Sequence, residues 1–126
     1  MKFSHEFSVE KSDIDELGLV NNVAFVRWVQ EVAIAHWLGA TTAEQQAKFI
    51  WIMLRHEIDY KKQAFAGERI TATTWVCVWT AVTCERFVEF KRGADLLAKS
   101  RTVWCMLDRQ TSKPTRISAE LKELFD

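Results

Sequence analysis

Hydrophobic and polar residues follow two different periods in the first third of the chain. Residues 2–9 alternate between largely apolar and polar side chains, and this period of two predicts a half-buried strand. Residues 10–21 are acidic and turn-like, and either Asn21 or Asn22 suits the cap of a following helix. From residue 23 to residue 38 the apolar residues recur at helical spacing around most of the surface, which predicts a long helix buried on several sides.

After this helix the composition becomes strand-like. Gly39 is expected to end the long helix, and a short second helix is expected over residues 42–47. Runs rich in β-branched and aromatic residues predict four strands, over 50–60, 68–79, 82–92 and 95–108. Residues 117–125 indicate a short terminal helix.

The order of these elements predicts a single α+β domain over residues 1–126, with one helix on a curved antiparallel sheet. In the strand at 50–60 one face is expected to hold Ile52, Leu54, His56, Ile58 and Tyr60. In the strand at 68–79 Trp75, Cys77 and Trp79 are expected to oppose Ala72, Thr74, Val76 and Val78. Because both faces are fairly apolar and one helix covers only one of them, we expect a homo-oligomer.

Composition excludes several classes of protein. Lysine and arginine (17) balance aspartate and glutamate (17), which argues against a nucleic-acid partner. Polar residues interrupt the N-terminal segment and no apolar run reaches about 20 residues, so we expect no secretory signal, no membrane association and a cytoplasmic location. Three cysteines without a Cys-x-x-Cys pair, and three distant histidines, predict neither a disulfide framework nor a metal site. Some of the six tryptophans are expected at a subunit interface or a binding groove.

The stretch SDIDELGLVNNVAFVRWVQEVAIAHW (12–37), together with the element order, resembles the hotdog-fold acyl-CoA thioesterases of the 4-hydroxybenzoyl-CoA thioesterase type. The family pattern stands here as Asp13, Asp15, Gly18, Val20, Asn21 and Asn22. Residues 57–76 and 107–117 are also similar to the family, so the resemblance extends over nearly the whole chain. It implies a hotdog fold, in which a curved antiparallel sheet wraps one long helix, and an enzyme that hydrolyses acyl thioesters.

Thioester hydrolysis needs an activating group and donors for the carbonyl oxygen. The sequence has no Gly-x-Ser-x-Gly motif and no recognisable Cys–His pair, which favours a carboxylate. The first N–H groups of a helix are free and its dipole is positive there, so each can contribute about 3 kcal/mol to oxyanion stabilisation. The resemblance implies that Asp15 is the carboxylate, as nucleophile or general base, and that the Asn22 N–H is the donor. It implies no cofactor and no metal.

Further residues receive roles by the resemblance or by elementary chemistry. Gly18, Val20, Asn21 and Thr83 are expected to contact substrate by resemblance, since relatives often carry serine or threonine at the place of Thr83. A turn with positive φ would need Gly18 equally, and a helix cap would need Asn21 equally. Asp13 is expected to hold the loop through hydrogen bonds to backbone N–H groups.

Other polar residues have competing explanations. Some hotdog enzymes use a helix acid, which makes Glu31 a candidate, but Arg27 four residues earlier predicts an ion pair instead. His56 is expected to be a core histidine bonded to a neighbour. Four basic residues are candidates for the phosphates of a carrier, namely Lys61, Lys62, Lys91 and Arg92.

Three functions remain open at this point. The first is a thioesterase acting on acyl-CoA or acyl carrier protein, and the absence of a basic residue in WTAVT (79–83) leaves the carrier undecided. The second is a dehydratase of acyl thioesters, disfavoured by Leu19 where many relatives carry histidine. The third is a non-catalytic thioester-binding module. The resemblance further implies a homodimer or homotetramer with its sites at the subunit boundary.

Overall fold

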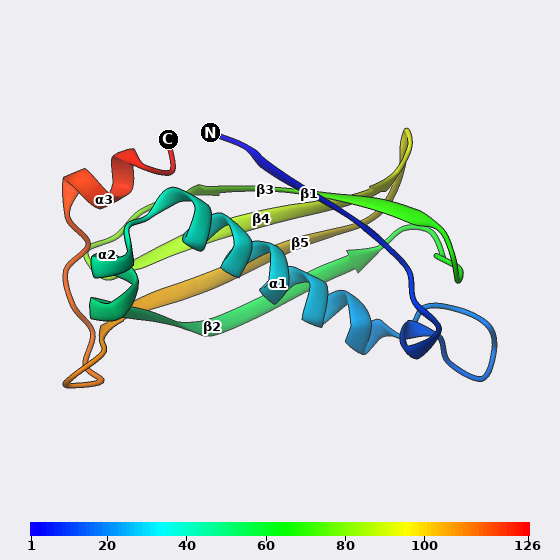
Figure 1. Ribbon diagram of the computed structural model, residues 1–126, viewed down its shortest axis with the longest axis horizontal. Coiled ribbons are helices and arrows are strands. Elements are labelled where there is room, and N and C mark those ends of the chain that lie inside the picture. The colour runs from blue at the N-terminus through cyan, green and yellow to red at the C-terminus, as the bar shows by residue number, and fades with distance from the viewer.

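A long helix crosses one face of a five-stranded sheet in the computed structural model, which describes residues 1–126 (Figure 1). The helices are α1 (Asn22–Ala40), α2 (Ala43–Lys48) and α3 (Ala119–Glu123), and a single 3-10 turn spans Lys11–Asp13. The strands are β1 (Phe3–Ser8), β2 (Phe49–Tyr60), β3 (Arg69–Cys77), β4 (Thr83–Arg92) and β5 (Asp95–Asp108). The predicted helix and strands are thus confirmed, with most boundaries displaced by one or two residues.

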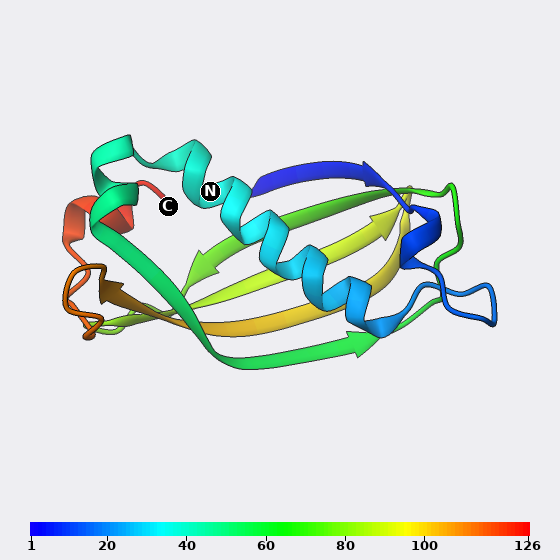
Figure 2. The ribbon, with the colours of Figure 1, turned by 60° about the horizontal axis from the view of Figure 1, so that its bottom comes forward.

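The sheet has the order β1-β3-β4-β5-β2, and every neighbouring pair is antiparallel. Two views show α1 lying along the same face of the curved sheet (Figures 1 and 2). This confirms the α+β hotdog arrangement implied by the resemblance. Strand β2 forms one edge, and its 12 residues pair only with β5.

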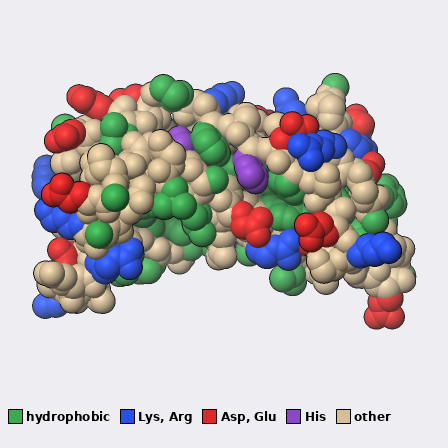
Figure 3. Space-filling model, viewed as in Figure 1, with side chains coloured by type: hydrophobic (Ala, Val, Ile, Leu, Met, Phe, Trp, Pro, Cys, Tyr) green, Lys and Arg blue, Asp and Glu red, His purple; other side chains and the backbone are tan.

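The core fills the space between α1 and the sheet. Its largest cluster contains Val9, Val20, Ala24, Phe25, Trp28, Val29, Val32, Ala64, Ile70, Ala72, Val88, Phe90, Leu97 and Ala98. Other apolar residues of α1 remain exposed, with Val23 at 70%, Ile34 at 56% and Leu38 at 53%. The expected burial of this helix on several sides is therefore wrong for a single chain (Figure 3 shows hydrophobic side chains gathered on the face of Figure 1).

Two local expectations about α1 and β2 are also wrong. Gly39 does not end the helix, which runs to Ala40 and closes with a hydrogen bond from the Thr41 N–H to the Trp37 carbonyl (3.1 Å). In β2 the pairing with β5 shifts between Met53 and Arg55. This bulge breaks the period of two. Ile52, Leu54, His56, Ile58 and Tyr60, which were expected on one face of the strand, therefore do not share one face.

The end of β3 turns one tryptophan inward. Alternation holds through Cys77, with Ala72, Thr74 and Val76 buried and the intervening residues half-buried. Val78 then adopts φ 53° and leaves the strand, so Trp79 packs towards Phe125 instead of lying beside Trp75 as expected. Trp75 remains on the outer face and stacks on Phe87 of β4, with 5.8 Å between ring centroids.

Candidate active site

Asp13 anchors the loop that precedes α1. Its side chain is only 2% exposed, and its Oδ2 accepts a hydrogen bond from the Glu10 N–H (2.9 Å). Its other oxygen pairs with the Arg27 guanidinium, which raises the pKa of Arg27. The Asp13 carbonyl also accepts from the Asn21 N–H (2.8 Å). The predicted structural role of Asp13 is confirmed, and Arg27 ties the loop to the helix.

Asp15 lies at the base of a tight turn that Gly18 completes. Asp15 Oδ1 accepts hydrogen bonds from the N–H groups of Leu17 (2.9 Å) and Leu19 (3.2 Å). Gly18 has φ 81° and donates its N–H to the Asp15 carbonyl (3.1 Å). Oδ2 of Asp15 accepts no hydrogen bond from the chain. The turn therefore fixes one carboxylate oxygen and leaves the other without a partner in the chain.

The start of α1 presents an unused backbone donor. The Asn21 side chain caps the helix by accepting from the Val23 N–H (2.9 Å), and the Asn21 carbonyl accepts from the Ala24 N–H (2.9 Å). The Asn22 N–H has no acceptor within the chain. The Tyr60 hydroxyl, at the end of β2, lies 3.5 Å from the Asn22 carbonyl. A carboxylate oxygen and a free helix N–H thus occur within one short segment.

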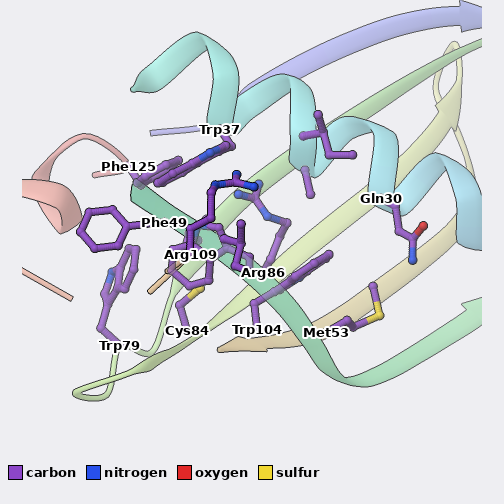
Figure 4. Close-up of a pocket in the computed structure, with 15 residues that line it drawn as sticks. Gln30, Trp37, Phe49, Met53, Trp79, Cys84, Arg86, Trp104, Arg109 and Phe125 are labelled. Carbon is purple, nitrogen blue, oxygen red and sulfur yellow. The ribbon is translucent and has the colours of Figure 1, made fainter. Parts of the chain in front are cut away.

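A cavity of about 440 Å³ lies between the C-terminal half of α1 and the sheet (Figure 4). Its lining consists of Gln30, Ala33, Ile34, Trp37, Phe49, Ile50, Trp51, Met53, Val76, Trp79, Cys84, Arg86, Trp104, Arg109 and Phe125. Twelve of these 15 residues are hydrophobic and none is acidic. Four of the six tryptophans line it, which agrees with the expected binding groove. Its volume falls within the range of about 300–1,000 Å³ that is usual for small-molecule sites.

Arg86 enters this cavity from the buried face of β4. The residue is 6% exposed, and its Nη1 donates to Thr74 Oγ1 (2.9 Å) and contacts His36 Nδ1 (2.9 Å). Burial lowers the pKa of Arg86 to about 10, so it stays protonated at neutral pH. Burial, followed by the charge of Arg86, lowers the pKa of His36 to about 4, so this imidazole is neutral and accepts the hydrogen bond.

Sequence reasoning missed Arg86 and His36, although one signal was present. In β4 the residues Cys84, Val88 and Phe90 occupy alternate positions and are buried. Arg86 falls in the same alternating series as these residues, so the period of two already predicts a cation on the buried face of the strand.

The model of the thioesterase-like superfamily matches residues 9–125. The chain belongs to this superfamily. Among curated proteins it is 26% identical over 107 residues to the uncharacterized protein Rv2001 of Mycobacterium tuberculosis. That match covers 85% of this chain and 42% of Rv2001, so the chain spans about two fifths of its curated relative.

Solved structures give the superfamily fold over the full chain. A 1,4-dihydroxy-2-naphthoyl-CoA thioesterase from Synechocystis superposes with a TM-score of 0.86 and is 18% identical, covering 99% of this chain and 96% of its own. A Staphylococcus aureus protein, SAV2348 in complex with CoA, has a TM-score of 0.86 and is 11% identical, covering 98% and 81%. At these identities the likeness establishes the fold. Membership of the superfamily supports thioester hydrolysis as the general chemistry.

The loop and the cavity of this thioesterase-like chain lie at opposite ends of α1. The helix has 19 residues, which corresponds to a length of about 28 Å. Asp15 precedes its first turn, whereas Ala33 and Trp37 of the cavity belong to its second half. Within one chain Asp15 therefore lies at the opposite end of α1 from the cavity.

The remaining site candidates fall on different sides of the molecule. Val20 is 4% exposed and packs in the core, so its side chain does not face a ligand, while its N–H donates to the Ala64 carbonyl (3.0 Å). Thr83 begins β4, hydrogen-bonds Thr80 and adjoins cavity-lining Cys84, away from Asp15. Glu31 pairs with Arg27 (3.1 Å) as predicted, close to Phe7 of β1.

The basic and metal-binding candidates contribute little to this site. Lys62 pairs with Asp95 (2.9 Å) and Arg92 with Glu68 (2.9 Å), so two of the four proposed phosphate contacts are engaged by acids. His56 has no hydrogen-bond partner and its Nε2 is buried, so the expected bond to a neighbour is wrong. No three His, Cys, Asp or Glu side chains converge as metal ligands would. None of the helices combines the length and apolar character needed to cross a bilayer.

Proposed function

We propose that this chain is a thioesterase that hydrolyses acyl-CoA thioesters, with Asp15 as the general base. The observation that carries the proposal is that one short segment holds both an open carboxylate oxygen, Asp15 Oδ2, and the unused Asn22 N–H at the start of α1. The oxygen is positioned by its partner Oδ1, which two backbone donors hold. The Asn22 N–H lies at the positive end of the helix dipole. Its hydrogen bond and the dipole would together stabilise an oxyanion.

The reaction proceeds through a tetrahedral intermediate. Asp15 Oδ2 takes a proton from water as the water oxygen bonds to the thioester carbon. The carbonyl oxygen becomes an oxyanion, which accepts a hydrogen bond from the Asn22 N–H. The C–S bond then breaks as the carbonyl re-forms, and the proton on Asp15 passes to the leaving thiolate. The products are a carboxylic acid and the free thiol, and the carboxylate of Asp15 is restored.

The proposal includes a homodimer that joins copies along β2. This strand is a long open edge, and Ile52 and Leu54 on it are exposed. An unpaired edge of this kind is a ready template for another strand, and a two-fold axis would pair two β2 strands in antiparallel fashion. The same contact would cover exposed apolar residues such as Ile34 and Leu38 of α1.

Antiparallel pairing would also complete the site. Strand β2 begins at the cavity, with Phe49 and Trp51, and ends at Tyr60 beside Asn22. In an antiparallel pair the Tyr60 end of one copy lies next to the Phe49 end of the other. Asp15 and Asn22 of one copy would therefore face the cavity of its partner, whose Thr83 lies at that same end. An acyl group could occupy the cavity while its carbonyl meets the loop.

The test is hydrolysis of short, medium, long and aromatic acyl-CoAs, followed by thiol capture, for wild type and Asp15→Asn. We expect the substitution to lower kcat by about 100-fold or more, because it keeps the shape and removes the base. Glu16→Gln is the matched control, since Glu16 is the adjacent exposed acid and makes no hydrogen bond or ion pair. Equal activity of Asp15→Asn and wild type would make Asp15 structural. Absence of hydrolysis of both acyl-CoA and acyl carrier protein thioesters would favour a binding module. Formation of an enoyl product with loss of water from a 3-hydroxyacyl thioester would favour a dehydratase.

A further inference from the structure

The cavity contains a buried cation that the chain does not neutralise. Arg86 forms no ion pair, and no acidic side chain lines the cavity around it. The neighbours that its guanidinium contacts are the neutral Thr74 hydroxyl and the neutral His36 ring. A buried charge without a counter-charge is unfavourable, and proteins normally pair it or place it against a ligand.

The guanidinium also retains unused hydrogen-bond donors. Both hydrogen bonds of Arg86 leave from Nη1, and neither Nε nor Nη2 has a partner in the chain. These two nitrogens form one side of the planar fork that binds a carboxylate through two parallel hydrogen bonds. Figure 4 shows the Arg86 side chain among the aromatic side chains that line the cavity.

A second donor in the cavity lining is unsatisfied. The Nε1–H of Trp51 is buried and has no hydrogen-bond partner, and Trp51 belongs to the lining. Leaving a buried donor unpaired is unfavourable, because the donor has lost its hydrogen bonds to water without gaining others. Two independent donors that lack acceptors therefore line a cavity whose other polar lining residues are Gln30 and Arg109.

We propose that this cavity selects acyl groups that are apolar along their length and end in a carboxylate, which Arg86 binds. The inference rests on the proposed thioesterase function and names its substrate class, the half-thioesters of dicarboxylic acids. The apolar stem packs against the tryptophan and phenylalanine rings, and the carboxylate supplies the acceptors that Arg86 lacks. An uncharged acyl chain of equal length would leave Arg86 unpaired.

The first experiment compares hydrolysis of glutaryl-, adipyl- and suberyl-CoA with pentanoyl-, hexanoyl- and octanoyl-CoA. We expect at least one carboxylate-bearing thioester to have a kcat/KM about 10-fold or more above its uncharged counterpart. In Arg86→Met this preference should disappear or reverse. Arg69→Met is the control, because Arg69 is an exposed arginine of neighbouring β3 that pairs with Glu6 and lies outside the cavity.

The second experiment measures binding without catalysis. Because four tryptophans line the cavity, titration with free adipate and suberate should change the tryptophan fluorescence of wild type, and hexanol should do so less. Arg86→Met, first shown by thermal denaturation to be folded, should lose the response to the diacids. If Arg86→Met does not fold, Arg86→Lys takes its place and should weaken diacid binding, because lysine keeps the charge and loses the planar fork.

The outcomes separate the two proposals. Diacid binding that depends on Arg86, without hydrolysis of any thioester, would support the anion pocket and overturn the thioesterase. Hydrolysis with equal rates for charged and uncharged chains, and no fluorescence response to diacids, would overturn the anion pocket and leave the thioesterase in place.

Discussion

The two ends of α1 differ in the environment that surrounds their polar groups. At the N-terminal end the loop around Asp15 is a network of backbone hydrogen bonds at the surface, with one carboxylate oxygen and one helix N–H left without partners in the chain. At the C-terminal end a largely apolar cavity encloses the Arg86 cation. Under the two proposals, the first end activates water and the second chooses the acyl group. The proposals thereby assign catalysis and selectivity to separate segments, which two copies would bring together.

The largest effect is expected when two variants, one with an altered loop and one with an altered cavity, are mixed. Asp15→Asn removes the base, and Ile34→Trp places a large ring at the cavity lining, where Ile34 is 56% exposed. If each site uses Asp15 of one copy and the cavity of the other, a mixed dimer has one intact site. After subunit exchange we expect about a quarter of the wild-type rate, since half of the dimers are mixed and each has one of two sites. Thiol capture measures the rate, and gel filtration checks that both variants dimerise. A mixture as inactive as its parents would place the whole site within one chain.

The buried cavity end should respond to acid in a way that the exposed loop does not. Burial lowers the pKa of His36 in the folded chain to about 4, below the unfolded value of 6.5, so folding is opposed by protonation. The contribution of neutral His36 is complete above pH 6.5 and is lost as pH falls towards 4, by about 2–3 kcal/mol. Arg86 and the N-terminal ammonium, both cationic, act on His36 in the same direction. Urea unfolding of wild type and His36→Gln between pH 4 and 7.5 should show a smaller acid loss in the variant. Parallel curves would mean that His36 does not control this stability.

Two glycines provide the smallest contrast, one at each end of α1. Gly18 has φ 81°, so Gly18→Ala should lower the free energy of unfolding by about 1–2 kcal/mol and reduce activity by displacing the turn that holds Asp15. Gly39 lies within the helix and a Cβ there meets no atom within 4 Å. Gly39→Ala should therefore raise the free energy of unfolding by about 0.5–1 kcal/mol and leave activity unchanged. Thermal denaturation gives both shifts, and changes of the same sign would contradict this account of the two glycines.

The sequence predicted local features well and features that depend on distant contacts poorly. The conformation of the segment around Asp15 could be predicted because turn residues, a cap and a helix pattern follow one another along the chain. The bulge after Met53 could not be predicted, because it depends on the pairing of β2 with β5. The hydrogen bond between Arg86 and His36 joins residues 50 positions apart. The only sign of it in the sequence was the alternation of buried residues along β4, which places Arg86 on the inner face. The exposed apolar residues Ile34 and Leu38 show the same limit, since a single chain does not bury them.

The positive φ angle of Val78 affects both the stability of the chain and the shape of the cavity. A β-branched residue at φ 53° is strained by about 1–3 kcal/mol, and here the strained residue turns Trp79 towards Phe125 and into the cavity lining. Selection for thermal stability alone would favour glycine at this position, which adopts the conformation freely but would also loosen the wall that Trp79 forms. Under the proposed function, stability and ligand binding therefore oppose each other at this corner of the molecule, as they commonly do near functional sites.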